Sequence, residues 1–537
     1  GVVPIEPASM AGRTVIQWDK DDLDPIGLVK IDLLGLGMLT ALSDALRRVR
    51  RDRGRPLALH TIPADDGPTY EMIRRADTVG VFQIESRAQM SSLPRNAPDR
   101  FYDLVVQVAL IRPGPIQGEM VHPYLRRRRG LEPIRTLHPL LEPVLRRTLG
   151  VPLFQEQGMR VAVVAAGFSP GQADALRRAM GSKRSRSQMS RLSLQLLAGM
   201  QERGIDRAIA ERIIKQLGAF ASYGFPESHA ASFALLVYAS AYLKRHYAPE
   251  FYAALLDAQP MGFYPVGSLL TDARRHGVEV RPLDVRRSGW GARLEGTRGG
   301  AHPFALRLGL GMIRGLGPGA KRGVMRALER GGPRSIEDFA RSSGLGQPSL
   351  RKLAKAGAFD ALAGDRRRAL WEVLRLGRVP AGPFDLRAED PQPPPLCAPS
   401  LRDRVAADYE SLGGSAERHP IELLRPSLEL AGIGTLRALR RREEGPVRVA
   451  GLVCSRQRPA TAKGFVFLAL EDETEMLNVI VHPDLFARRR ERIVSSPVLV
   501  IDGRLQRSSG TLDLVAEEIE GLDAVPGADA AGSHDFH

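Results

Sequence analysis

The hydrophobic pattern of this chain changes its period along the sequence, and this constrains the fold more than any other feature. From 65 to 260 the apolar residues recur at helical spacing. From 446 to 519 they form five short strand-like runs, with one helical run between the third and the fourth. Because 537 residues are too many for one hydrophobic core, we expect several domains and an α+β class overall.

The second half of this pattern predicts a small barrel. The strand-like runs are VRVAGLVC, GFVFLAL, MLNVIV, PVLVIDGRLQ and LDLVAEEI, and the helical run is PDLFARRRERI. This is the order of an OB-fold, a barrel that commonly binds single-stranded nucleic acid. Arg456, Arg458 and Lys463 lie in the turn between the first two strands, where such barrels often contact nucleic acid. The alternative is a solvated hairpin.

The charge balance favours a polyanionic partner. Lys and Arg outnumber Asp and Glu by 77 to 61, which gives a net charge of +16. Charge alone does not choose nucleic acid over an acidic membrane surface, but no apolar run approaches the roughly 20 residues that span a bilayer. The two cysteines, Cys397 and Cys454, have no CxxC or histidine pattern around them. We therefore expect a reducing cytoplasm, no zinc site and no disulfide.

A single acid stands out near the start of the chain. Asp32 lies in the middle of the apolar strand-like run Leu28–Leu34, and Lys30 is the only nearby group that could neutralise it. A carboxylate on a buried strand is costly unless it is paired or binds a metal. Two-metal phosphoryl transfer requires several carboxylates that converge on Mg²⁺. The alternative is an Asp32 that pairs with Lys30 or caps the next helix.

The segment FSPGQADALRRAMGSKR predicts a helix with a basic end. Ser169 is the expected N-cap, and the helix is expected to end at Gly181. Four cations then cluster at its C-terminal end: Arg177, Arg178, Lys183 and Arg184. The helix dipole favours cations at this end, but a bound triphosphate would also relieve their mutual repulsion. Both interpretations remain open.

Two further segments combine a rigid turn with residues that could bind nucleic acid. Tyr223, Phe225 and His229 stand at the mouth of an apolar helix that begins near Ser228, where they could stack on a base or simply join the core. LIRPGPIQGEMVHPYLRRRRG places Arg112 before a Pro-Gly-Pro turn and a run of arginines after it, which includes Arg126 and Arg127. Such a run follows a nucleic-acid backbone or forms a solvated face.

The glycine-rich stretch GLGPGAKRG resembles a helix-hairpin-helix turn. Gly315 and Gly317 would let backbone N–H groups approach a phosphate at a helix N-terminus. Lys321 and Arg322 lie beside it. Most short glycine-rich turns are only turns, so this motif alone is weak evidence.

Taken together and in order, six motifs resemble the palm-to-fingers core of bacterial DNA polymerase III alpha subunits, the C family of DNA polymerases. They are KIDLLGLGMLT, GVFQIESRAQM, LIRPGPIQGEMVHPYL, LFQEQGMRVA, ADALRRAMGSKR and YGFPESHAASFALL. VPIEPASMAGRTVIQWDKDDLD, ESRAQMSSLP and the final SHDFH are similar to the error-prone branch rather than the replicative one. The resemblance covers nearly the whole chain.

The resemblance implies a multidomain α+β layout in chain order. It comprises the end of a palm (1–36), large helical fingers (37–262), a little-finger domain with a helix-hairpin-helix (263–377), a proline-rich linker with a helical segment (378–445), a C-terminal OB-fold β-barrel (446–522) and a flexible tail (523–537).

The resemblance also implies roles for individual residues. Asp32 would be the third palm carboxylate and bind catalytic Mg²⁺, with Lys30 near the phosphates. The incoming triphosphate would be held by Arg177, Arg178 and Lys183, in a nucleotide pocket lined by Tyr223, Phe225 and His229. DNA would be bound by Arg112, Arg126, Arg127, Gly315, Gly317, Lys321 and Arg322, and the single-stranded template by the barrel with Arg456, Arg458 and Lys463.

The implied activity is error-prone DNA-directed DNA polymerisation, in which a primer is extended with dNTPs across damaged template DNA. The family's other two metal-binding acids lie in a PDxDxD motif, and neither this motif nor the N-terminal phosphoesterase-like domain is in this sequence. We therefore expect the chain alone to be inactive. The resemblance implies an accessory Y-family-like protein, clamp contact through it, and work on the nucleoid. The alternatives are a fragment of a replicative alpha subunit and a non-catalytic DNA-binding remnant.

Overall fold

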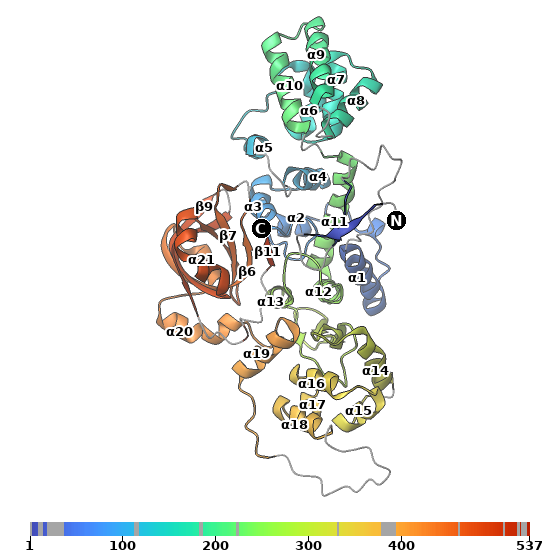
Figure 1. Ribbon diagram of the computed structural model, residues 1–537, viewed down its shortest axis with the longest axis vertical. Coiled ribbons are helices and arrows are strands. Elements are labelled where there is room, and N and C mark those ends of the chain that lie inside the picture. The colour runs from blue at the N-terminus through green and yellow to red at the C-terminus, as the bar shows by residue number, and fades with distance from the viewer. Residues whose placement is uncertain are drawn as a thin grey trace.

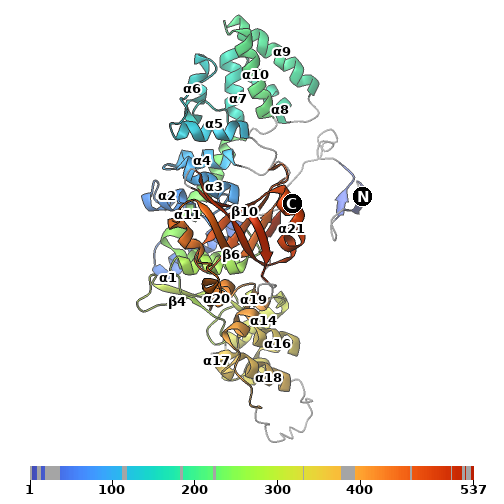
Figure 2. The ribbon, with the colours of Figure 1, turned by 90° about the vertical axis from the view of Figure 1, so that its left-hand side faces the viewer.

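The computed structural model describes residues 3–8, 14–18, 37–111, 118–181, 186–221, 225–329, 332–376, 394–459, 462–508, 511–522, 527 and 534–536. Five of the expected site residues lie outside these ranges: Lys30, Asp32, Arg112, Lys183 and Tyr223. The molecule is elongated. A bundle of helices forms each end, and a β-barrel lies beside the helices of the middle (Figures 1 and 2). None of the described helices is long and apolar enough to cross a membrane.

The middle of the molecule is a set of helices around a long buried one. Helix α11 (Glu227–His246) lies at the centre, and its second half is buried on nearly every side. It packs against α1 (Gly37–Arg53), α2 (Gly67–Arg74), α4 (Phe101–Leu110) and α12 (Ala248–Asp257). Helices α3 (Arg87–Asn96) and α5 (Gly118–Arg128) continue this layer. The almost uniformly apolar sequence of α11 predicted a buried helix, which holds for its second half, whereas Ser228, His229 and Leu235 in its first half are exposed.

Helices α6 to α10 form a separate bundle at one end, which we call the distal module (Figure 1). They are α6 (Glu142–Leu145), α7 (Gln155–Ala166), α8 (Pro170–Gly181), α9 (Arg186–Glu202) and α10 (Arg207–Ala221). The module has its own hydrophobic core, which includes Leu176, Leu196 and Ile213 and is separate from the core of the middle.

The other end carries the helix-hairpin-helix region. Helix α13 (Val266–Arg275) leads from the middle into a small sheet of β3 (Val280–Arg281), β5 (Phe304–Arg307) and β4 (Arg293–Gly296), in that order. The helices that follow are α14 (Pro318–Glu329), α15 (Ile336–Ser343), α16 (Gln347–Lys355), α17 (Asp360–Ala363) and α18 (Arg366–Leu376). Helices α19 (Leu401–Leu412) and α20 (Arg425–Leu430) then lead to the barrel.

The barrel has the predicted strand order. Its elements are β6 (Gly445–Gln457), β7 (Val466–Glu471), β8 (Met476–Val481), α21 (Pro483–Ser495), β9 (Val498–Ser508) and β10 (Thr511–Gly521). The sheet closes because β6 pairs with both β7 and β9, while β10 pairs antiparallel with β9 and parallel with β8. The prediction of an OB-fold is confirmed.

Two short strands complete the described chain. Near the start, β1 (Ile5–Pro7) and β2 (Thr14–Ile16) form an antiparallel hairpin. At the end, β11 (His534–Phe536) pairs parallel with Ser455–Gln457 of β6. The sequence predicted a flexible tail over 523–537, whereas these three residues are extended and paired. They add to the end of β6 that extends beyond its pairing with β9.

Candidate nucleic-acid and nucleotide interface

Helix α8 presents two of the predicted triphosphate ligands to solvent. The Ser169 hydroxyl accepts from the N–H of Gln172 (3.3 Å) and the Gln172 amide oxygen accepts from the N–H of Ser169 (2.8 Å), so the predicted cap is confirmed. Arg177 and Arg178 both bind one carboxylate, that of Asp174, at 2.9 and 2.7 Å. The hydrogen bond from Arg177 lowers the pKa of Asp174. One carboxylate thus faces two guanidinium groups, which leaves an excess positive charge on this surface.

The predicted aromatic corner is a row of rings along the start of α11. The ring centroids of Phe225 and His229 are 5.0 Å apart, and those of His229 and Phe233 are 4.1 Å apart. Phe233 in turn contacts Phe82 of the core. His229 is exposed and Phe225 is half-buried, so one end of the row reaches the surface and the other is fixed in the interior. A flat base can stack on such a row.

The corner is also where the distal module joins the middle. Phe154 and Phe225 form an isolated parallel bridge, in which the N–H of Gln155 donates to the carbonyl of Phe225 (3.0 Å). The Tyr102 hydroxyl donates to the carboxylate of Glu227 at 2.9 Å. Arg147 of the module lies over the Tyr102 ring, 4.1 Å from its centroid. We call this set of contacts the distal junction.

The run of arginines in the last turn of α5 divides into structural and exposed members. Arg127 donates to the carbonyl of Leu149 (2.8 Å) and binds Glu132 (3.1 Å), so most of its donors serve the fold. Arg128 binds the buried carboxylate of Asp103 at 2.7 Å. The Arg126 side chain is 63% exposed and lies 3.7 Å from Glu132. The sequence alone did not distinguish these roles.

The glycine-rich turn leads directly into α14. Gly315 has a φ of 71°, which glycine adopts freely, and its carbonyl accepts a hydrogen bond from Lys352. A Cβ on Gly323 would lie 2.5 Å from the carbonyl oxygen of Ser343, so this glycine allows α14 and α15 to approach closely. Lys321 and Arg322 are exposed on the first turn of α14, beside Gly317. Cations placed near a helix N-terminus favour phosphate binding.

The predicted barrel contacts differ from one another. Arg456 lies within β6 rather than in the predicted turn, because the strand continues to Gln457. It donates to the carbonyls of Ile493 (2.6 Å) and Ser496 (2.8 Å) and so joins β6 to the end of α21. Arg458 is exposed and lies 5.1 Å from the Phe486 ring centroid. Lys463 is exposed in the turn between β6 and β7. A cation over an aromatic ring at this turn suits a single-stranded nucleic acid.

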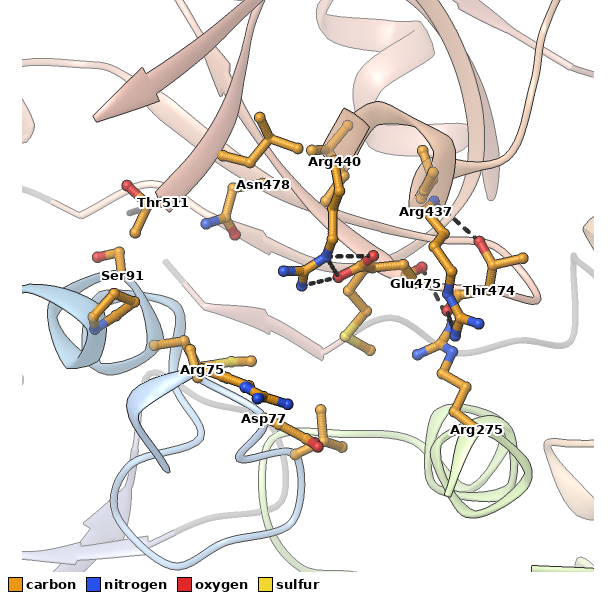
Figure 3. A pocket seen from close by; sticks show the side chains of 18 of the residues that line it. Arg75, Asp77, Ser91, Arg275, Arg437, Arg440, Thr474, Glu475, Asn478 and Thr511 are labelled. Atoms are coloured by element: carbon orange, nitrogen blue, oxygen red, sulfur yellow. Dashed lines mark hydrogen bonds and ion pairs between the residues drawn. The ribbon is translucent and has the colours of Figure 1, made fainter. Parts of the chain in front are cut away.

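The structure adds a cavity of about 740 Å³ between the barrel and the middle, which we call the interdomain cavity (Figure 3). Its walls come from α2, α3 and α13 on one side and from β8, β10 and the 3-10 helix Leu436–Arg441 on the other. Six arginines line it: Arg75, Arg87, Arg275, Arg437, Arg440 and Arg507. Our interpretation of the sequence missed this site, because these arginines are spread over more than 400 positions and form no motif.

One group of residues in the described part of the chain is close enough to hold a metal ion. Ligand atoms of Asp77, Asp272 and His276 lie within 4.8 Å of one another. However, the ammonium group of the fully buried Lys244 lies 2.9 Å from Asp77 and 2.8 Å from Asp272. Burial alone would raise the pKa of Asp77, but the charge of Lys244 and the hydrogen bond from His276 hold it well below its usual value. The group does not fit a divalent ion, because a lysine already occupies its centre.

Comparisons with protein families match the chain in the same order as its domains. "Bacterial DNA polymerase III alpha NTPase domain" matches residues 1–35, and "Bacterial DNA polymerase III alpha subunit finger domain" matches residues 38–204. "Helix-hairpin-helix motif" matches residues 277–369, and "OB-fold nucleic acid binding domain" matches residues 447–522. The last two coincide with the glycine-rich turn and the barrel.

Curated relatives match along the whole chain. The error-prone DNA polymerase of Anaeromyxobacter sp. (strain K) is 52% identical over 553 residues, which cover 100% of this chain and 48% of that protein. The error-prone DNA polymerase of Burkholderia pseudomallei is 50% identical and that of Methylococcus capsulatus is 48% identical, over 100% and 97% of this chain and 51% of each relative. The chain thus spans about half the length of the curated relatives it matches. It belongs to the bacterial DNA polymerase III alpha subunit family, among the relatives that are named error-prone DNA polymerases.

Proposed function

We propose that this chain forms the fingers, the helix-hairpin-helix region and the OB-fold of an error-prone DNA-directed DNA polymerase. The reaction is template-directed transfer of a nucleotide from a dNTP to the 3′-hydroxyl of a primer, and it serves translesion synthesis and damage-induced mutagenesis. The observation that carries this proposal is the identity of 52% and 50% with error-prone DNA polymerases over the full length of the chain.

The incoming nucleotide is assigned to the distal module and the aromatic corner. Arg177 and Arg178 bind its triphosphate together with Lys183, since one carboxylate cannot neutralise this group of cations. The row of Phe225 and His229, with Tyr223, lines the pocket for the base. The support for this assignment is the exposure of the Arg177, Arg178 and His229 side chains.

DNA is assigned to the glycine-rich turn before α14, to arginines of the fingers and to the barrel. Gly315, Gly317, Lys321 and Arg322 bind the duplex backbone, and Arg112, Arg126 and Arg127 contact DNA from the side of the fingers. Arg458 and Lys463 bind the single-stranded template. Arg456 stabilises the strand that leads into their turn, through its hydrogen bond to the carbonyl of Ile493. These roles are supported by the exposure of Lys321, Arg322, Arg458 and Lys463. Arg127 already donates to the carbonyl of Leu149, so only its remaining N–H groups can contact DNA.

DNA polymerases of this family use divalent metal ions, and we propose Mg²⁺ bound by Asp32, with Lys30 near the phosphates. Both residues lie outside the described part of the chain, and the group around Asp77 does not replace them because Lys244 occupies it. When bound, the ion supplies positive charge to the triphosphate.

The remaining parts of the proposal concern domains and partners. The palm is assigned to 1–36, the fingers to 37–262, the little finger to 263–377, the linker and helical segment to 378–445, and the OB-fold to 446–522. The enzyme works on primer-template DNA at the nucleoid, in the cytoplasm. An accessory Y-family-like mutagenesis protein connects it to the sliding clamp.

Primer extension by the full-length protein that contains this chain tests the proposal. The double variant Arg177→Gln/Arg178→Gln is expected to raise the KM for dNTP by about tenfold or more, because two charge-assisted contacts are lost. The Kd for primer-template DNA should not change. Arg207→Gln is the matched control, because its i,i+4 partner Glu211 is also on an exposed helix.

Two outcomes would contradict the assignment. An unchanged KM for dNTP in the double variant would remove Arg177 and Arg178 from the nucleotide site. A full-length wild-type protein that binds primer-template DNA but extends no primer would support the alternative of a non-catalytic DNA-binding protein.

A further inference from the structure

The interdomain cavity holds positive charge that its own side chains do not neutralise. Arg437 donates to the carbonyl of Thr474 (2.9 Å), and Arg507 donates to the carbonyls of Leu439 (3.1 Å) and Arg440 (2.6 Å). Carbonyl groups fix the orientation of a guanidinium but leave its charge intact. Neither guanidinium group forms an ion pair with a carboxylate within the described ranges.

Arg87 is the strongest sign of a missing ligand. It comes from α3, on the wall opposite the barrel, and its Nη2 contacts only the sulfur of Met476 (3.4 Å). Its Nε is buried and has no hydrogen-bond partner. A buried N–H group without an acceptor is costly, so an acceptor from outside the chain would be stabilised at the Nε of Arg87.

Two more buried polar atoms on the cavity walls are unsatisfied. They are the Nε of Arg275 on α13 and the Oδ1 of Asn478 on β8. Figure 3 shows Arg75, Ser91, Arg440, Asn478 and Thr511 reaching from opposite walls around one common space. Three of the six arginines are ion-paired: Arg75 with Glu71, Arg275 with Glu471 and Arg440 with Glu475. Among the described residues, the charge that no carboxylate balances lies at Arg87, Arg437 and Arg507. The cavity therefore offers several cationic donors and one amide acceptor to a single ligand.

The basic lining continues along α3 away from the cavity. Burial lowers the pKa of Arg95 against the charge of Asp513, and the nearby charge of Arg129 lowers it further. Arg95 on α3 and Arg129 just after α5 thus lie near enough for their charges to interact, so cations follow Arg87 along the same helix. A path of cations several residues long fits a chain of phosphates better than one isolated anion.

We propose that the interdomain cavity is a phosphate-binding site formed jointly by α3 and the barrel, and that its ligand is a single strand of nucleic acid. The strand passes between the fingers and the OB-fold, with one phosphate at Arg87 and neighbouring phosphates toward Arg437 and Arg507. Asn478 is placed to accept from a base. This inference rests on the proposed function and adds to it a site for the strand between two domains, in addition to the exposed turn at Arg458.

Binding of fluorescent oligothymidylate to the whole chain, measured by anisotropy across a salt series, tests the proposal. Arg87→Gln is expected to weaken binding by about tenfold and to reduce the slope of log Kd against log salt by about 0.7, the value for one lost phosphate contact on a single strand. Because Arg87 is half-buried, a second variant guards against misfolding. Ser91→Glu places a carboxylate on the same wall and should weaken binding at least as much, through repulsion.

Controls separate this site from the rest of the proposed function. Arg207→Gln should bind the oligonucleotide like the wild type. Duplex DNA should bind Arg87→Gln normally, because the duplex is assigned to Lys321 and Arg322. If duplex binding is normal and oligonucleotide binding is unchanged in both cavity variants, this inference fails and the proposed function stands. If the wild-type chain binds neither DNA, the proposed function fails with it.

The source of the phosphate is tested by competition with free dNTP. The proposal predicts that dNTP does not displace the oligonucleotide from the wild type at concentrations that saturate primer extension. Displacement by dNTP that disappears in Arg87→Gln would overturn the strand assignment and make the cavity a site for free nucleotides.

Discussion

The barrel and the distal module are joined to the middle of the molecule in different ways. The barrel rests on α13 through buried polar groups: the carboxylate of Glu471 accepts from Ser268 (2.5 Å) and from the thiol of Cys454 (3.0 Å), and binds Arg275 (3.1 Å). Burial raises the pKa of the Cys454 thiol well above its usual value. The distal module has a core of its own and is joined at the junction by one bridge and a few part-buried contacts.

Under the proposed function, this difference separates a firmly attached surface that would bind DNA from a surface that would bind the nucleotide and is attached by fewer contacts. Buried charged contacts restrict the barrel to one position, so the interdomain cavity keeps its shape. The distal module carries Arg177 and Arg178 and is attached near Phe225, where few contacts would have to change during a rotation. We propose that in this arrangement the barrel holds the strand in place while the surface of Arg177 and Arg178 approaches or leaves.

Removal of Arg275 is expected to weaken the attachment of the barrel more than any other change considered. Arg275→Ala leaves the buried carboxylate of Glu471 without its cation and should lower the free energy of unfolding by about 3–5 kcal/mol. Chemical denaturation measures this loss, and limited proteolysis should show cleavage near the barrel first. Arg341→Ala, which removes an exposed i,i+4 pair, should cost less than about 1 kcal/mol. Equal losses in the two variants would mean that the barrel is not held by its buried charges.

The pH dependence of stability that Glu85 causes tests whether water reaches the buried middle of the molecule. Its carboxyl group accepts from the N–H of Gly80 (3.0 Å), and burial raises its pKa from 4.5 to about 8. The folded protein therefore binds a proton there that the unfolded chain releases, so stability from this group is full below about pH 4.5 and is lost as the pH rises through about 8. Between about pH 5 and pH 8 the loss should be about 3 kcal/mol.

Glu85→Gln should remove this part of the pH dependence, because glutamine stays neutral. Parallel unfolding curves of the wild type and the variant at each pH isolate the contribution of one group. A difference between the two proteins that does not vary with pH would show that Glu85 is ionised in the folded state and that water reaches it.

The distal junction should be weaker. Tyr102→Phe removes the hydrogen bond to Glu227 and is expected to destabilise the protein by about 1 kcal/mol. Hydrogen exchange should increase at the start of α7 and α11 and stay unchanged in the barrel. Tyr70→Phe is the matched control, because the Tyr70 hydroxyl makes no hydrogen bond in the described part of the chain. Faster exchange in the barrel of Tyr102→Phe would mean that the two attachments are coupled.

Sequence patterns predicted the parts of the molecule that local physics decides. The alternation of β6 to β10, the capped start of α8 at Ser169 and the buried α11 all follow from spacing within one segment. The split between Arg127 and Arg126 could not be predicted, because it depends on a carbonyl 22 residues away. The interdomain cavity was missed for the same reason: Arg87, Arg275 and Arg437 come together only after the barrel has packed on α13.

The salt dependence of primer-template binding by this chain tests the central claim most directly. The account predicts a Kd that rises steeply with salt, and a log–log slope that falls by about two in Lys321→Gln/Arg322→Gln, because each lost duplex phosphate contact removes about 0.9. A Kd that does not change with salt, or a slope that the double variant leaves unchanged, would contradict it.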